Sequence, residues 1–138
     1  MYIMDKSQIS MEFIILLGFI LIVSIPLIVI YYGYSNETKF ELSQNQAMKI
    51  AHKIVDNAES VFYLGEPSKT TIKVSMPENI DKIIIHEKEV VFIIRYKGMP
   101  NDIVVDSPVS LSGNLSSSSG IRYITIKASG NNVVIKDS

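Results

Sequence analysis

The sequence contains no cysteine, which excludes a disulfide framework, a thiolate nucleophile and a cysteine-based metal site. Net charge is also nearly absent, because 13 basic residues balance 14 acidic ones to leave −1. No basic stripe runs along the sequence, so we expect neither nucleic acid nor anionic lipid to attract the chain. The sequence shows no Ser-His-Asp order, glycine-rich phosphate loop or His-Glu-x-x-His motif. We therefore expect no enzymatic activity, no cofactor and no metal.

Charged residues are missing from Phe13 to Tyr34 as well. A helix of this length rises roughly 33 Å at about 1.5 Å per residue, which matches a hydrocarbon core of about 30 Å. The run is longer than the apolar part of a cleaved secretory signal, about 7–15 residues, and it closes with tyrosines typical of a membrane interface. The sequence therefore predicts a single membrane span that stays in the protein. Flanking charges are too few to set its orientation, but we expect the short N-terminus inside and the larger C-terminal part outside.

A second helical pattern follows the apolar run, over residues 35–66. Apolar residues recur three or four positions apart and define a narrow stripe of Ala47, Ile50, Ala51, Ile54, Val55, Ala58, Val61 and Phe62. Gly65 is a typical residue just after a helix, and Pro67 makes continuation improbable. This segment is predicted to be an amphipathic helix.

From residue 67 to 138 the apolar residues alternate with period two and are enriched in β-branched types. The predicted strands are TTIKVSM, DKIIIHE, EVVFIIRY, DIVVDSPVSLS, IRYITIKAS and NVVIKDS. A sheet of this size has one apolar face that must be covered, and the amphipathic helix is the available cover. We therefore predict an α+β fold in which a long N-terminal helix precedes a small antiparallel β head packed on it.

The residues directly ahead of the apolar run read Lys6-Ser7-Gln8-Ile9-Ser10-Met11-Glu12-Phe13. This stretch resembles the class III signal peptide of archaeal type IV pilin-like proteins, particularly the methanogen group whose mature chain begins Gln-x-Ser-x-Glu-Phe. In that family a membrane peptidase cuts before the apolar helix, and the helix stays with the mature protein. The resemblance implies a processing site formed by Lys6, Ser7, Gln8, Ser10 and Glu12, with the cut between Ser7 and Gln8. The segments would then be a leader (1–7), an apolar helix (8–34), an amphipathic helix (35–66) and a β head (67–138).

The resemblance implies a structural subunit of an adhesion-type, type IV pilus-like filament on an archaeal cell surface. Its partners would be the prepilin peptidase, an assembly ATPase with its membrane platform, membrane lipid before assembly, and other copies of the chain. Glu12 stands at the edge of the apolar run, where an unpaired carboxylate is costly to bury. By the resemblance, Glu12 meets the free amine of a neighbouring subunit, so Glu12 and Phe13 are the predicted assembly residues. The other interpretation of Glu12 is a carboxylate that simply extends into the headgroup zone.

Two triplets match the N-glycosylation pattern, Asn36-Glu37-Thr38 and Asn114-Leu115-Ser116. Asn114 is the preferred candidate, because the serine run that follows it predicts an exposed loop, whereas Asn36 would be crowded where helices bundle. Two other functions stay open at this point. One is a single-span, membrane-anchored surface binding module, and the other is a minor pseudopilin of a secretion or uptake apparatus.

Overall fold

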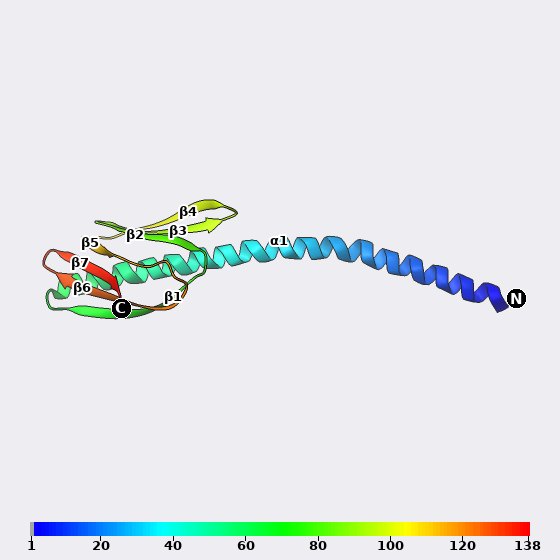
Figure 1. Ribbon diagram of the computed structural model, residues 1–138, viewed down its shortest axis with the longest axis horizontal. Helices are drawn as coiled ribbons and strands as arrows, with labels where there is room; N and C mark the ends of the chain where they lie inside the picture. Colours follow the sequence, from blue (N-terminus) through cyan, green and yellow to red (C-terminus); the bar gives the residue numbers. More distant parts are fainter. Residues whose placement is uncertain (1) are drawn as a thin grey trace. The chain divides into compact units, whose positions relative to one another are not determined.

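The structure is a computed structural model that describes the backbone from Tyr2 to Ser138 and the side chains from Ser10 onward. Over these residues a long helix, α1 (Tyr2–Leu64), is followed by seven strands, which Figure 1 shows in chain order. The strands are β1 (Lys69–Met76), β2 (Ile80–His86), β3 (Glu89–Tyr96), β4 (Met99–Asp106), β5 (Leu111–Asn114), β6 (Gly120–Ser129) and β7 (Asn132–Asp137). The predicted α+β fold is confirmed.

The chain divides into two compact units, residues 1–39 and residues 40–138. The first unit consists of the early part of α1, which continues as a helix through Pro26. Proline removes one backbone N–H and leaves the carbonyl four residues earlier without its usual donor, which a membrane helix tolerates when neighbours supply a partner. The second unit holds the rest of α1 and all the described strands.

Helix α1 ends at Leu64, directly before Gly65, as the sequence predicted. Gly65 has a φ of +72°, and its N–H donates to the carbonyls of Val61 (3.2 Å) and Phe62 (3.1 Å). A residue in the left-handed region closes the helix in this way because its N–H turns back onto carbonyls that would otherwise lack donors. Glycine adopts that conformation without a side-chain clash. The chain then turns directly into β1.

The strands form two sheets, one with the order β1-β6-β7-β5 and one with the order β2-β3-β4. Every pair is antiparallel except β5 with β7, which are parallel. The segment DIVVDSPVSLS, predicted to be one strand, instead supplies the end of β4 and the start of β5. Two backbone bonds redirect the chain here, from the Ser107 N–H to the Lys88 carbonyl (2.8 Å) and from the Leu111 N–H to the Glu87 carbonyl (2.7 Å). These bonds tie the connection between the sheets to the β2–β3 turn.

The core of the second unit lies between α1 and the inner faces of both sheets. The predicted stripe on α1 is buried from Ala47 to Val61, with Phe62 partly buried against the same core. The strand residues that are fully enclosed with it include Val90, Phe92, Ile94, Ile124, Ile126, Val133 and Ile135. Burying an aliphatic or aromatic side chain of this kind contributes roughly 1.5–3 kcal/mol, so this shared core accounts for the cohesion of the unit. The three alanines of the stripe, Ala47, Ala51 and Ala58, are completely buried.

The free edge of β1 is covered by side chains from α1. The Gln46 side-chain amide donates to the Ser75 carbonyl at 2.8 Å, and the Lys53 ammonium donates to the Lys73 carbonyl at 3.0 Å. An uncovered edge strand offers unpaired carbonyls to other chains and invites unwanted pairing. The helix therefore both fills the core and satisfies the outer strand.

Candidate functional site

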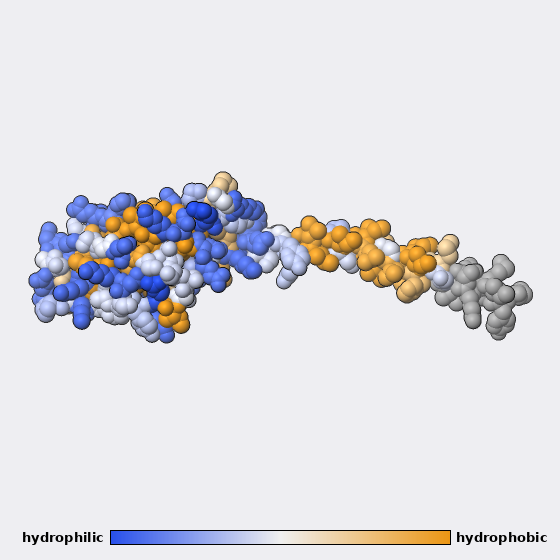
Figure 2. All heavy atoms as spheres, in the orientation of Figure 1, coloured by the Kyte–Doolittle hydropathy of each residue, from blue (hydrophilic) through white to orange (hydrophobic). Residues whose placement is uncertain are grey.

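The most unusual surface in the first unit is the apolar part of α1. Every large apolar side chain from Met11 to Tyr34 is exposed, with exposed fractions from 45% at Val23 to 72% at Tyr31. Figure 2 shows this part of α1 covered almost continuously by hydrophobic residues, whereas the visible surface of the second unit is mostly hydrophilic. A helix that is apolar on all sides must be surrounded by lipid or by other apolar helices.

The length and hydropathy of this helix agree with the predicted membrane span. Among the described residues, one helix, α1, is long and apolar enough to cross a bilayer. None of its most apolar stretch is buried within the chain, unlike the core helix of a globular protein. This single apolar helix is compatible with a membrane anchor.

The predicted processing and assembly residues lie at the start of the apolar segment. Ser10, Glu12 and Phe13 are exposed on α1, and Phe13 has an exposed fraction of 63%. No hydrogen bond or ion pair joins Glu12 to any side chain that the structure describes. The side chains of Lys6, Ser7 and Gln8 lie outside the described residues.

Asn114, the preferred glycosylation candidate, is the last residue of β5 and is exposed. The serines after it are anchored, because the Ser116 N–H donates to the Asp137 carboxylate at 2.8 Å and the Ser116 and Ser118 hydroxyls lie 2.9 Å apart. Asp137 also forms an ion pair with Arg122 at 2.9 Å. The loop that was predicted to be exposed is therefore fixed at its first residues, and Asn114 lies at its base.

Asn36, the second candidate, is exposed on α1. Its triplet has a helical backbone, and the Thr38 hydroxyl donates to the Tyr34 carbonyl at 3.0 Å. Serine and threonine commonly bond back to a helical carbonyl in this way. The hydroxyl of this triplet is therefore engaged within its own helix.

The fold also gathers a charged surface that the sequence pattern did not indicate. Four exposed lysines lie on the outer face of the β1-β6-β7-β5 sheet. In the sequence they are far apart, on β1 near the start of the head and on β6 and β7 near its end. They are Lys69, Lys73, Lys127 and Lys136, here called the lysine face. A sequence inspected for basic runs does not show this cluster, because the strands that carry it come from opposite ends of the head. The register of the strands is the information that reveals it.

No group of three or more His, Asp or Glu side chains in the described part of the chain is arranged to hold a metal ion. No family model, curated protein or solved structure matches this chain. Two features of the chain bear on its function: the exposed apolar part of α1, with the motif at its start, and the surface of the head.

Proposed function

We propose that the chain is the precursor of a structural subunit of an archaeal type IV pilus-like surface filament of the adhesion type. The observation that carries this proposal is the Gln8-x-Ser10-x-Glu12-Phe13 motif at the start of the part of α1 that exposes apolar side chains on every side. A prepilin peptidase would remove residues 1–7 and leave the helix in the mature chain. An assembly ATPase with its membrane platform would then move the subunit from the membrane into the filament.

The exposed helix suits both stages of this pathway. In the membrane its side chains contact lipid, and in a filament they would contact the same helix of other copies. Each large apolar side chain kept from water contributes roughly 1.5–3 kcal/mol, so a helix with this surface is not stable alone in solution. Contacts of one subunit with the next through different surfaces propagate into an open helical assembly. The apolar segment would thus form the filament core.

The second unit, residues 40–138, has a core of its own, whose members all lie at or after Phe40. It therefore buries its apolar residues without using the segment from Met11 to Tyr34. This separation supports a division of roles in which the first unit packs with copies of itself and the second unit coats the outside.

Glu12 has a specific role in this proposal. Cleavage before Gln8 creates an α-amino cation one helical turn ahead of Glu12. Either charge is costly to bury alone among apolar helices, but an amine from one subunit matched to a carboxylate from the next offsets that cost. The absence of a partner for Glu12 among the described side chains is consistent with pairing between subunits.

The test replaces Glu12 with Gln or Ala in the native host and measures the filament protein sheared from cells against the protein left in membranes. We expect sheared protein to fall by about tenfold or more, because a buried unpaired ammonium costs several kcal/mol, while the membrane level stays unchanged. Glu37→Gln is the matched control, since Glu37 is an exposed carboxylate on the same helix beyond the apolar run. Gel mobility of the membrane form separates loss of processing from loss of assembly. Unchanged filament yield in both Glu12 variants would remove the proposed pairing.

A single-span surface protein is the second candidate, and the membrane-spanning length of the apolar helix supports it equally well. Such a protein would stay entirely in the membrane fraction. A minor pseudopilin would be processed at Gln8 but would contribute little to the sheared material. The distribution of the chain between the two fractions, together with its N-terminal residue, therefore separates the three functions.

A further inference from the structure

The lysine face is an outward surface of the head. On β1, β6 and β7 the residues of the opposite face, such as Ile72, Ile124 and Ile135, are buried in the core. The residues between them point outward and include all four lysines, each of which is exposed. The other outward residues on these strands are Thr71, Ser75, Ile121, Tyr123, Thr125, Ser129, Asn132 and Val134.

Like charges stand close together on this face. Lys69 is the direct register partner of Lys127 across β1 and β6, and Lys136 is the partner of Thr125 on the next strand. Like charges directly opposite in a sheet destabilise it by roughly 0.2–1 kcal/mol. An arrangement that costs stability without helping the core suggests that the charge is used.

No side-chain carboxylate stands among the four lysines on this face. The outward positions of the three strands hold no Asp or Glu, and no ion pair within the described part of the chain involves the four lysines. Of two nearby acids, Asp137 pairs with Arg122 at 2.9 Å, whereas Glu66 accepts the Gly130 N–H at 2.7 Å and keeps its negative charge at the margin of the face. The face is therefore cationic, although the whole chain has a net charge of −1.

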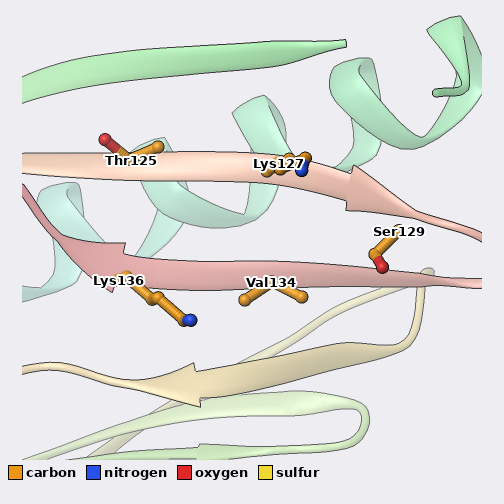
Figure 3. Close-up of a pocket in the computed structure, with 5 residues that line it drawn as sticks. All are labelled: Thr125, Lys127, Ser129, Val134 and Lys136. Carbon is orange, nitrogen blue, oxygen red and sulfur yellow. The ribbon is translucent and has the colours of Figure 1, made fainter. Parts of the chain in front are cut away.

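A hollow of about 300 Å³ lies within this face. Figure 3 shows its lining along two adjacent strands, with Thr125, Lys127 and Ser129 on β6 and Val134 and Lys136 on β7, and with α1 behind them. The Thr125 hydroxyl already bonds to Thr71 (3.2 Å) and to Ser138, whereas no described residue bonds to the Ser129 hydroxyl. The hollow thus offers two ammonium groups, an open hydroxyl and a small apolar wall, and its volume is at the lower end for ligand sites, about 300–1,000 Å³.

We propose that the lysine face binds an acidic polysaccharide. Lys127 and Lys136 would hold the carboxylate or sulfate groups of the sugar, the Ser129 hydroxyl would bond to sugar hydroxyls, and the other two lysines would extend the contact along the chain. Tyr123, the register partner of Lys73, has an exposed fraction of 51% and offers a ring for a sugar to pack on. This role goes beyond filament formation and does not depend on it.

A polysaccharide fits the surroundings of the face better than a nucleic acid does. Domains that bind nucleic acid by charge typically have a pI above about 9, whereas this chain has a pI of about 6.1. Proteins that bind single strands stack successive bases on a series of aromatic side chains, and the outward positions of these strands hold one aromatic residue. The hydroxyl-rich surroundings instead match the many hydroxyls of a sugar chain.

The experiment measures binding of the full-length chain in detergent micelles, produced in a host without N-glycosylation. That choice matters because Asn114 is the register partner of Lys136, so a glycan there would stand beside the face. The probes are labelled polygalacturonate, which carries carboxylates, dextran sulfate, neutral dextran and an oligothymidine strand. Three double variants are compared with the wild type. In the first, Lys127 and Lys136 are both changed to Gln, and in the second, both are changed to Arg. In the control, Lys82 and Lys88, two exposed lysines of another surface, are both changed to Gln. Because all these positions are exposed, near-UV circular dichroism should show every variant folded.

We expect at least one acidic polysaccharide to bind, with affinity falling as salt rises and no binding of neutral dextran. The Gln pair at Lys127 and Lys136 should weaken binding by about tenfold or more, because each charge-assisted contact is worth roughly 1.5–3 kcal/mol. The control pair should change the affinity by less than about twofold. The Arg pair should keep most of the affinity. Preference for carboxylate or sulfate would identify the anionic group.

Absence of binding to both acidic polysaccharides, or equal binding by the wild type and the Gln pair, would overturn the proposal. Tighter binding of oligothymidine than of either polysaccharide at the same salt would also overturn it and assign the face to nucleic acid. Filament assembly plays no part in this measurement, so failure here leaves the proposed filament function standing, and loss of filaments in Glu12 variants leaves this proposal standing.

Discussion

Phe40 and Tyr96 stack with their ring centroids 4.1 Å apart and their planes 20° from parallel. Phe40 lies on α1 at the start of the second unit, and Tyr96 ends β3, so the stack fixes the first packed turn of the helix to the three-stranded sheet. The Lys97 ammonium lies 5.1 Å from the centre of the Tyr96 ring and adds a cation–π contact. The Tyr96 hydroxyl, by contrast, is buried with no hydrogen-bond partner among the described residues.

Replacing Tyr96 with Phe should therefore stabilise the head. The variant keeps the ring stack and removes a buried hydroxyl that lacks a partner, which should raise the free energy of unfolding by about 1 kcal/mol. Thermal unfolding of the full chain in detergent, followed by near-UV circular dichroism, measures the effect. Tyr63→Phe is the control, because Tyr63 is 73% exposed and its change should be neutral. A clear loss of stability in the Tyr96 variant would mean that the hydroxyl has a partner.

Gly113 should not accept any side chain. A Cβ at this position would lie 1.9 Å from the Ile135 carbonyl oxygen on β7, and the φ of Gly113 is +138°. Gly113→Ala should cost roughly 3 kcal/mol or more, because both strands must separate to make room. Gly120→Ala provides the control, since Gly120 also has a positive φ but has no atom within 4 Å of the added Cβ. Equal losses in the two variants would show that backbone conformation alone is responsible.

Asp137 should hold the serine run that follows Asn114. Its carboxylate accepts the Ser116 N–H and pairs with Arg122, so Asp137→Ala removes both contacts. We expect hydrogen exchange at the Ser116 amide to accelerate by about tenfold or more, consistent with the loss of a charged hydrogen bond worth roughly 1.5–3 kcal/mol. Asp102→Ala, at an exposed position of β4, should leave that exchange unchanged. Unaltered exchange at Ser116 in the Asp137 variant would contradict the proposed anchor.

Glycosylation in the native host is predicted at Asn114 and not at Asn36. Asn114 is exposed at the end of a strand, whereas the Asn36 triplet is helical and its Thr38 hydroxyl is engaged with Tyr34. Asn114→Gln should lower the intact mass of the protein by the mass of one glycan. Asn36→Gln should change the intact mass only by the difference between asparagine and glutamine. A glycan lost on Asn36→Gln would reverse this assignment.

The helical part of the fold was predictable because its signals are local. The spacing of small and branched apolar residues identified the buried stripe from Ala47 to Val61, and Gly65 marked the end of α1. The sequence signal for the β6–β7 hairpin is also local. Gly130 and Asn131 form its two-residue loop, and Gly130 has a φ of +59°. In each case a few neighbouring residues determine the backbone conformation.

The arrangement of the sheets was less predictable, because it depends on contacts between distant segments. The alternation in DIVVDSPVSLS suggested one strand, but bonds from Ser107 and Leu111 to the β2–β3 turn divide it between two sheets. The parallel pairing of β5 with β7 likewise has no local sequence signal. The pairing of β1 with β6 places Lys69 beside Lys127 on one face of the sheet. The cationic face could therefore not be found by searching the sequence for runs of basic residues.

Processing between Ser7 and Gln8 distinguishes a pilin-like subunit from a single-span surface protein. Mass spectrometry of the N-terminal peptide should be carried out on chain from the native host, separately for membranes and for material sheared from the cell surface. We predict that the sheared chain begins at Gln8 or its pyroglutamate form. A chain that begins at Met1 or Tyr2 and occurs only in membranes would contradict the pilin-like function and leave a single-span surface protein.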